Sequence, residues 1–262
     1  MNNILKEIVG YTKFRIDEEK MKISLEKTIE LAFSIQTESN FRFENALKTK
    51  EISLICECKK ASPSMGIIDY NYNYINIARE YEASGASCIS VLTEPKWFMG
   101  SDDHLVDVVK NVSIPCIRKD FIVDEYMIYQ SKIIGASAVL LICSVLDKYS
   151  LRRYLRICQD LGLSALVEVH TENEIDIALE AGARIIGVNN RNLKDFSVDI
   201  RTSERLRKVV PSDVLFVSES GIKTESDVRR LIEIGVDAML IGEAFMKSDN
   251  KSKLIDSWRG KK

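Results

Sequence analysis

A glutamate and a lysine stand two residues apart near the end of an apolar stretch, Ser53 to Lys59. Alternate side chains of a strand share a face, so Glu57 and Lys59 lie on one face together with Ile55. A strand buried in a parallel sheet is expected to be apolar on both faces. The pair therefore indicates either catalytic chemistry or an internal ion pair that closes the end of a barrel, and this strand alone favours neither.

Polar residues also stand at the ends of four other predicted strands. Lys119, Glu168, Asn189 and Glu219 each occupy such an end, and alternation places each of them where it could face one shared mouth. Buried ion networks stabilise proteins only weakly, so a convergence of acids and lysines from several strands favours a catalytic site over a device for stability.

These residues are positioned by a regular succession of strands and helices. Gly85, Gly135, Gly182 and Gly235 recur about every 50 residues, and each follows a helical pattern and opens a short apolar segment. The eight predicted strands are Ser53 to Lys59, Gly85 to Leu92, Ile114 to Lys119, Gly135 to Ile142, Ser164 to Val169, Gly182 to Val188, Val214 to Ser218 and Gly235 to Ile241. Four such βαβα quarters predict an α/β fold, the closed (β/α)8 TIM barrel. A doubly wound open sheet is the alternative, but it would not require so regular a repeat.

The barrel is predicted to occupy residues 49–262, and residues 1–48 a helical extension of the same single domain. Apolar residues recur at helical spacing in 4–9 and in 25–33. We interpret residues 15–22 as a charged connection between two helices, and residues 40–50 as a segment leading into the first strand.

Composition limits the classes of partner. The 262 residues carry 37 basic and 39 acidic side chains, a formal net charge of −2, which gives no basic field for nucleic acid. The apolar runs are too short to span a membrane, and the start of the chain lacks the apolar core of a signal peptide. We therefore expect a cytoplasmic enzyme acting on a small molecule, and a monomer.

The six cysteines and two histidines do not predict a metal site. The cysteines lie mostly in apolar patterns without the paired spacing of a zinc site, so we expect reduced packing residues. His104 is expected to be a solvated surface residue. His170 follows the fifth strand and precedes Thr171, a candidate helix N-cap, and we expect it to lie behind the catalytic groups.

Glycines after the last two strands suggest a phosphate site. Ser220 and Gly221 follow the seventh strand, and Gly242 and Glu243 follow the eighth. Barrels of this kind commonly bind phosphate there, through backbone N–H groups and a helix N-terminus. The alternative, ordinary turn glycines, is weakened because both pairs stand at the two strands where such a site is expected.

Aromatic residues are predicted to flank the same mouth. Trp97 and Phe98 lie in the loop after the second strand, and Phe121 lies two residues beyond the lysine that ends the third. Together with Pro63 and Leu140, Phe98 and Phe121 could form a flat apolar slot suited to a planar aromatic ring.

Seven motifs, in one order along essentially the whole chain, strongly resemble the indole-3-glycerol-phosphate synthase family. They are Glu57-x-Lys-x-x-Ser-Pro-Ser64, Leu92-Thr-Glu94 with Phe98 and Gly100, Arg118-Lys-Asp-Phe121, Leu166-Val-Glu-Val-His170, Gly187-Val-Asn-Asn-Arg-Asn-Leu193, Ser218-Glu-Ser-Gly-Ile222 and Ile241-Gly-Glu-Ala244. Seven ordered motifs are far more specific than any one of them.

The resemblance implies a lyase of tryptophan biosynthesis. It would convert 1-(2-carboxyphenylamino)-1-deoxyribulose 5-phosphate to indole-3-glycerol phosphate, carbon dioxide and water, without a cofactor. By motif position Lys119 would be the general acid and Glu168 a general base or acid, with Glu57, Lys59, Asn189 and Glu219 as catalytic and electrostatic neighbours. The implied substrate-binding residues are Ser62, Pro63, Phe98, Phe121, Leu140, Arg191, Leu193, Ser220, Gly221, Gly242 and Glu243.

Two departures from the family pattern are mild. Cys58 stands where a larger apolar residue or Tyr is usual, and alternation turns it toward the helices. Glu243 stands where Ser is common, but its backbone N–H can still bind phosphate. Neither departure removes a catalytic group.

Two other functions remain open at this point. A phosphoribosylanthranilate isomerase would share the fold and the aromatic phosphosugar substrate, but it fits poorly with the Glu57-x-Lys59 strand and the Lys119-Asp-Phe121 motif. A non-catalytic phosphosugar-binding barrel would keep the glycines and lose a carboxylate or a lysine, and none is lost here.

Overall fold

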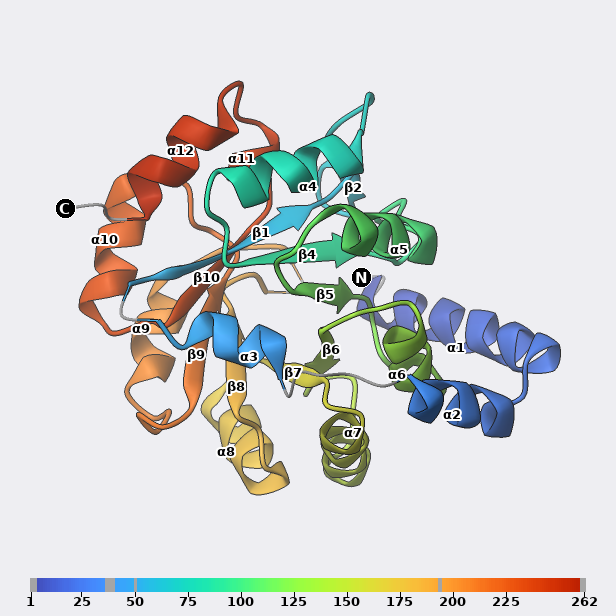
Figure 1. Cartoon of the computed structure of the whole chain (residues 1–262). Helices are drawn as coiled ribbons and strands as arrows, with labels where there is room; N and C mark the ends of the chain where they lie inside the picture. Colours follow the sequence, from blue (N-terminus) through green and yellow to red (C-terminus); the bar gives the residue numbers. More distant parts are fainter. Residues whose placement is uncertain (1–3, 36–40, 50, 193–194, 260–262) are drawn as a thin grey trace.

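The fold is a closed barrel of eight parallel strands surrounded by helices (Figure 1). The computed structural model describes residues 4–35, 41–49, 51–192 and 195–259. The barrel strands are β1 (Ser53–Cys58), β4 (Cys88–Leu92), β5 (Cys116–Lys119), β6 (Ala138–Ile142), β7 (Ser164–Val169), β8 (Ile185–Asn189), β9 (Leu215–Glu219) and β10 (Ala238–Ile241). They pair in chain order, and β1 closes the barrel by pairing with both β4 and β10. The predicted TIM barrel is confirmed, and the open sheet is excluded.

Helices cover the outside of the barrel between consecutive strands. They are α4 (Tyr74–Ala83), α5 (Asp102–Asn111), α6 (Tyr126–Ile133), α7 (Lys148–Asp160), α8 (Glu172–Ala181), α9 (Arg201–Arg207), α10 (Glu225–Glu233), α11 (Glu243–Met246) and α12 (Lys251–Trp258). A small antiparallel hairpin, β2 (Ala61–Ser62) with β3 (Gly66–Ile67), follows β1. The polar loop after the first strand therefore has a defined shape.

The repeated glycines end helices, as the spacing predicted. Gly85, Gly135, Gly182 and Gly235 all have φ between 76° and 96°, the left-handed region, and each lies within two residues of the end of a helix. Glycine adopts this conformation without steric cost, so it can reverse the chain into the next strand. The regular repeat in sequence is thus a repeat of helix-to-strand turns.

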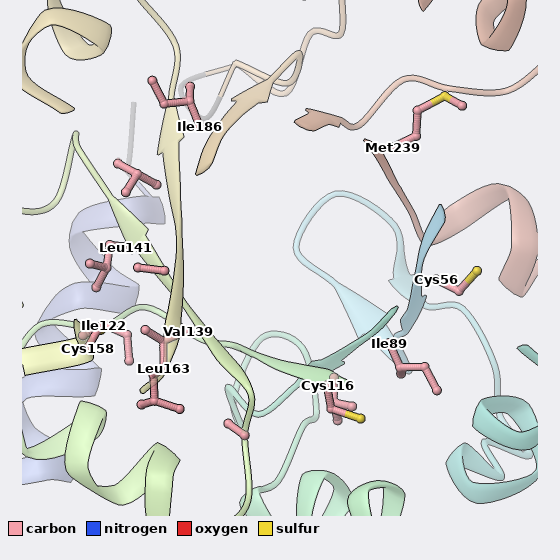
Figure 2. Packing of buried hydrophobic residues seen from close by; sticks show 14 of the residues in the cluster. Cys56, Ile89, Cys116, Ile122, Val139, Leu141, Cys158, Leu163, Ile186 and Met239 are labelled. Atoms are coloured by element: carbon pink, nitrogen blue, oxygen red, sulfur yellow. The ribbon is translucent and has the colours of Figure 1, made fainter. Parts of the chain in front are cut away.

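Two apolar layers follow from strand alternation. Ile55 and Ile117 belong to an inner cluster inside the barrel, whereas Cys56, Cys58 and Ile89 belong to the larger cluster between strands and helices. Figure 2 shows part of this outer layer, with side chains that come from several strands. The six cysteines are free thiols, five of them fully buried, which confirms the prediction that they are packing residues and that Cys58 faces the helices.

The extension differs from prediction in its first half. Residues 15–22 are not a connection but the second half of α1 (Ile4–Lys22), followed by α2 (Leu25–Ser34). The buried positions Ile8, Thr12 and Ile16 continue at a spacing of four residues, and no Gly or Pro interrupts them after residue 10. Asp17 and Glu18 are exposed on one face of α1, whereas Arg15 and Lys20 form ion pairs with the segment after β5. The next helix, α2, packs beside α6 (Figure 1).

The segment that leads into β1 contains a short helix, whose place the sequence had not specified. It contains α3 (Arg42–Leu47), whose Phe43 and Leu47 are buried in the inner apolar cluster. Glu44 of the same helix accepts hydrogen bonds from Arg184 and Lys48, both at 2.7 Å. The helix therefore covers the N-terminal end of the barrel, opposite the end where the predicted site residues lie.

None of the described helices is long and apolar enough to cross a membrane.

Candidate active site

Lys119 ends β5 and lies between two carboxylates that come from other strands. Its Nζ is 3.7 Å from Oε2 of Glu168 on β7 and 3.6 Å from Oε2 of Glu219 on β9. The side chains are 15%, 3% and 2% exposed. The three strands thus bring an ammonium group and two carboxylates together inside the barrel mouth, as alternation predicted.

A second acid and base come from β1. Nζ of Lys59 donates a hydrogen bond to Oε1 of Glu57 at 2.5 Å, and Oγ of Ser90 donates to Oε2 at 3.3 Å. Burial raises the pKa of Glu57, but Lys59 and Lys119 outweigh burial, so the pKa lies below its ordinary value. Glu57 is therefore held as a carboxylate, which keeps both lysines in a negative environment.

The pKa values of Lys119 and Glu219 are both raised. Burial lowers the pKa of Lys119, but the surrounding Glu219, Glu168 and Glu57 more than compensate, so the ammonium stays charged. Burial raises the pKa of Glu219 to about 8 despite Lys119, because Glu168 and Glu57 also disfavour a further negative charge. Near neutral pH the site can thus hold both a charged ammonium and a protonated carboxyl group.

A glycine makes room for Glu219. A Cβ at Gly187 on β8 would collide with Oε1 of Glu219 and would lie 3.0 Å from a methyl group of Leu166. A larger residue on this inward face would displace the carboxyl group. The strand glycine is therefore required by the close approach of the site residue.

The charged cluster lines a cavity with an apolar wall. Phe98, Phe121, Pro63 and Leu140 all contribute to this wall, and the rings of Phe98 and Phe121 are 6.0 Å apart between centroids. Phe98 is positioned by Glu94, a buried carboxylate that accepts hydrogen bonds from the backbone N–H groups of residues 96 to 98. The predicted slot is thus present beside the lysines, and Ser62 lies in the lining as well.

A second cavity adjoins the first at the ends of β9 and β10. Ser220, Gly221, Gly242 and Glu243 line it, and Ser220 and Gly221 have φ of 64° and 82°, a conformation that turns the chain sharply after β9. A Cβ at Gly242 would lie 2.5 Å from Oε1 of Glu57 and 2.9 Å from Nζ of Lys59. The glycine thus permits close packing between the loop and the Glu57–Lys59 pair. Basic residues also line this cavity: Lys59, Arg191, Lys223 and Lys247.

The two cavities form one continuous site. Glu57, Lys59, Arg191, Ser220 and Glu243 line both of them. A long substrate could therefore place a ring in the slot and an anionic group beside the glycines.

Adjacent asparagines after β8 have different positions. Asn189 lines the first cavity, and its Oδ1 accepts a hydrogen bond from the backbone N–H of Arg191 at 3.0 Å. Asn190 turns away, and its amide links Ser218 and Ser203 with backbone carbonyls after β9. The predicted residue Asn189 faces the site, whereas Asn190 holds the neighbouring loop. Leu193, also predicted to bind substrate, lies outside the described residues.

A buried ion network behind Lys119 was not predicted. Arg118 is fully buried, with Nη2 at 2.8 Å from Asp102 and 3.5 Å from Asp120. Asp120 also accepts a hydrogen bond from Arg15 of α1 at 2.9 Å and from Thr93 at 2.8 Å. The network ties the helical extension to the strand that carries the lysine. The charges of Arg118 and Asp120 around Lys119 were visible in sequence, but their distant partner on α1 was not.

The first turn of α1 also contributes to the cavity, which sequence reasoning missed. Ile4, Leu5 and Ile8 line it together with the predicted residues. Their helical spacing predicted only a helix that must pack on something. The surface that it covers is the open end of the barrel.

Other expected positions turned out differently. Trp97 points away from the mouth and packs edge-on against Tyr11 of α1, with ring centroids 5.7 Å apart. His104 is half-buried, 4.2 Å from the ring of Tyr74, and so is not the solvated residue that was predicted.

His170 lies behind Glu168, as expected, and Thr171 caps α8 with a capping box.

Within the described ranges, no group of three or more His, Cys, Asp or Glu side chains is arranged to hold a metal ion.

Comparison with a family model and with known proteins identifies the same family. The model of the indole-3-glycerol phosphate synthase family matches residues 5–257. The indole-3-glycerol phosphate synthase of Ruminiclostridium cellulolyticum is 52% identical over 257 residues, which cover 98% of this chain and 99% of the relative. That of Endomicrobium trichonymphae is 51% identical over 248 residues, covering 94% and 96%.

Solved structures share the fold at low sequence identity. The 3-hexulose-6-phosphate synthase of Salmonella typhimurium has a TM-score of 0.65 at 14% identity, covering 79% of this chain and 97% of that one. Thiamine phosphate pyrophosphorylase of Pyrococcus furiosus has a TM-score of 0.61 at 15% identity, covering 83% and 96%. These similarities support the barrel and say nothing about the reaction.

Proposed function

The chain belongs to the indole-3-glycerol phosphate synthase family, and from that premise we propose how its own residues carry out the family reaction. This reaction is a decarboxylating ring closure of tryptophan biosynthesis. It converts 1-(2-carboxyphenylamino)-1-deoxyribulose 5-phosphate into indole-3-glycerol phosphate, carbon dioxide and water.

The observation that carries the proposal is the position of Lys119. Its ammonium group lies between Glu168 and Glu219 and lines the same cavity as the aromatic slot. Ring closure joins the ring carbon that bears the carboxylate to the ketone carbon of the sugar. A charged ammonium group beside the ketone oxygen can donate a proton to that oxygen as the new bond forms.

Decarboxylation and dehydration complete the product. Loss of carbon dioxide returns the bonding electrons to the ring and restores its aromaticity. The hydroxyl group then leaves as water, which requires an acid at that oxygen and a base that removes a proton from the neighbouring carbon or nitrogen. Glu168 is proposed as this base. The acid is a lysine, Lys59 or Lys119, or Glu219, whose raised pKa leaves it protonated near neutral pH.

The substrate is proposed to lie across both cavities. Phe98 and Phe121 would contact the anthranilate ring, and Pro63 and Leu140 would complete the apolar slot. The phosphate group would accept hydrogen bonds from the backbone N–H groups of residues 220, 221, 242 and 243, near the lysines and Arg191 of the second cavity. Inorganic phosphate should therefore compete with substrate, and a phosphate complex with the anion beyond hydrogen-bond reach of both loops would require another site.

A direct assay tests the activity. Purified protein is mixed with 1-(2-carboxyphenylamino)-1-deoxyribulose 5-phosphate, and the fluorescence of the indole product is followed. Phosphoribosylanthranilate is the control substrate. Turnover of the control alone would identify an isomerase, and binding without turnover of either would identify a non-catalytic barrel.

We further propose that the protein is a cytoplasmic monomer whose extension (residues 1–48) and barrel (residues 49–262) form one domain. The ion pairs Arg15–Asp120 and Glu44–Arg184 link the two parts, and the reduced cysteines suit a reducing compartment. Size-exclusion chromatography with light scattering tests the oligomeric state, and a single cooperative unfolding transition is expected for one domain.

A further inference from the structure

His170 lies directly behind Glu168. The two residues share the inward face at the end of β7, and Nε2 of the imidazole is 3.7 Å from Oε1 of Glu168. This nitrogen is buried and has no hydrogen-bond partner in the part of the chain that the structure describes. The distance exceeds that of an N–H···O hydrogen bond by less than about 1 Å, so a small rotation of either side chain would close it.

The imidazole also borders a third cavity, which shares Leu5 and Asn189 with the substrate cavity. This cavity is about 550 Å³ in volume and is lined mainly by polar residues, among them His170, Thr171 and Asn192. Glu168 lines the substrate cavity but not this one, whereas His170 lines this one but not the substrate cavity. The imidazole therefore lies between the Glu168 carboxylate and the third cavity.

The reaction needs a proton from solvent in every turnover. A carboxylate leaves as neutral carbon dioxide and a hydroxyl group leaves as water. The site gives one proton to the ketone oxygen and another to the departing hydroxyl group, and recovers only one from the neighbouring carbon or nitrogen. One proton per turnover must therefore be replaced from solvent.

We propose that His170 is a proton relay between the third cavity and Glu168, and that Glu168 passes the proton on to Lys119. Nδ1 takes up a proton from solvent in this third cavity while the Nε2–H group gives its proton to Oε1 of Glu168. A flip of the ring then returns a protonated nitrogen to the side of Glu168. The carboxyl group then transfers a proton to the amine of Lys119, whose Nζ lies 3.7 Å from the other carboxylate oxygen. No bond other than those to hydrogen changes, and the ring ends the cycle with its starting charge. The inference rests on the proposed role of Glu168.

The groups around His170 are suited to this role. Glu168 faces Nε2, and Oε2 of Glu174 on α8 is 3.8 Å from Nδ1, so the ring is flanked by two carboxylates. Oε2 of Glu174 also accepts the backbone N–H of His170 at 2.6 Å, which fixes that carboxylate beside the ring. Asp199 and Arg205 are charged residues that also line this third cavity. The ring is thus held between two carboxylates, with Nε2 on the side of Glu168.

The test compares a single turnover with repeated turnovers. His170→Gln removes the titrating group and keeps a polar side chain, and His104→Gln is the matched control because the chain has only two histidines. A site that starts with its acids protonated completes one cycle without the relay. We expect His170→Gln to leave the single-turnover rate within about twofold of the parent in dilute buffer but to lower steady-state kcat about tenfold.

Two further readouts separate a relay from a structural role. Added imidazole should restore kcat of His170→Gln, and the solvent deuterium isotope effect on kcat should be larger than in the parent. His104→Gln should match the parent in all measurements. His170→Asn is a second variant in case the first folds poorly, as judged by its melting temperature.

The outcomes are distinguishable from a failure of the proposed function. If the parent protein makes no indole product, the proposed function itself is wrong. If the parent is active and His170→Gln retains parental kcat, or loses single-turnover rate and kcat in parallel without rescue by imidazole, the relay is wrong and the function stands.

Discussion

Two clusters of buried charge share β5 and differ in how closely their members are paired. On the inward face, Nζ of Lys119 lies 3.6 and 3.7 Å from its carboxylate partners. On the outward face, Arg118 and Asp120 make contacts of 2.8 to 2.9 Å with their nearest partners.

We propose that the inward charges take part in the reaction and that the outward charges hold the fold. Groups that are loosely paired and face a cavity can exchange protons and contact a substrate, and they cluster at functional sites. Groups that are closely paired between strand and helices resist such change, and removal of one partner leaves a buried charge uncompensated. Neighbouring residues of one strand therefore belong to two different functions of the molecule.

The largest expected effect is loss of turnover when Lys119 is changed. Lys119→Ala should reduce kcat by at least the ~10²- to 10⁴-fold typical of a positioned general acid, because its electrostatic role is lost as well. Lys119→Arg should also fail, since a guanidinium group is a very poor proton donor and has a different shape. Product fluorescence measures both variants, and Lys110→Ala on the exposed side of α5 is the control.

Lys119→Ala should change the free energy of unfolding and the affinity for substrate much less than it changes kcat. The reason is that the carboxylates left without the lysine can take up protons. A kcat within about tenfold of the parent, only ~1.4 kcal/mol in barrier height, would move the acid role to Lys59. A large loss of stability would remove the distinction between the two faces of β5.

The outward cluster should show the reverse pattern. Arg118→Met keeps much of the side-chain volume but leaves Asp120 and Asp102 without this cation, so the free energy of unfolding should fall by about 3–5 kcal/mol. Urea denaturation measures the change. Lys27→Ala, in an exposed pair with Glu30, is the control and should alter stability by less than about 1 kcal/mol. An unaltered stability with lost activity would place Arg118 in catalysis instead.

Glu219 and Asp120, one carboxyl group from each cluster, should respond oppositely to pH. The pKa of Glu219 is raised from an ordinary 4.5 to about 8, chiefly by burial, so between these values the folded state binds more protons than the unfolded state. This group therefore lowers stability as pH rises from about 5 to 8, by at most about 1.4 kcal/mol per pH unit. Asp120 is the opposite case, because Arg15 and Arg118 outweigh its burial and lower its pKa, so its contribution is lost as pH falls through the acid range.

Glu219→Gln checks this contrast. Urea denaturation at several pH values from 5 to 8 should show the variant gaining stability relative to the parent as pH rises. Parallel stability curves for parent and variant would mean that Glu219 ionises normally in the folded protein.

The smallest expected effect concerns the aromatic slot. Phe121→Ala should weaken product binding by about 1.5–3 kcal/mol, the range for burial of one large apolar side chain. Isothermal titration with product measures the change, and Phe14→Ala on the exposed surface of α1 is the control. Unchanged product affinity would mean that the slot does not hold the ring.

The barrel and most of the site could be predicted from local patterns. The alternation of side chains along each strand predicted that four site residues face inward: Glu57, Lys119, Glu168 and Glu219. Parallel strands also place all their C-terminal ends at one side of the barrel, so these residues were expected to meet. The repeated glycines predicted the turns from helix to strand, because glycine adopts the positive φ that these turns require without steric cost. The family motifs added the reaction to this geometry.

The extension was predicted less well because its structure depends on what it covers. The charged residues 15–22 looked like a connection, although Arg15 and Lys20 continue α1 and pair with Asp120 and Asp124. A polar helix face and a polar loop have similar composition. The helix was recognisable only from its buried stripe and from partners more than 100 residues away in the chain.

The sequence by itself determined the number of barrel strands, the face of the site residues at the strand ends and the family, because these are recorded in short-range spacing and ordered motifs. Only the tertiary structure decided that the start of α1 borders the substrate cavity and that Trp97 packs against Tyr11. It also decided that His170 lies between Glu168 and the third cavity. The physical reason is that alternation specifies the face of a side chain, whereas the group that meets it there depends on the packing of elements far apart in the chain.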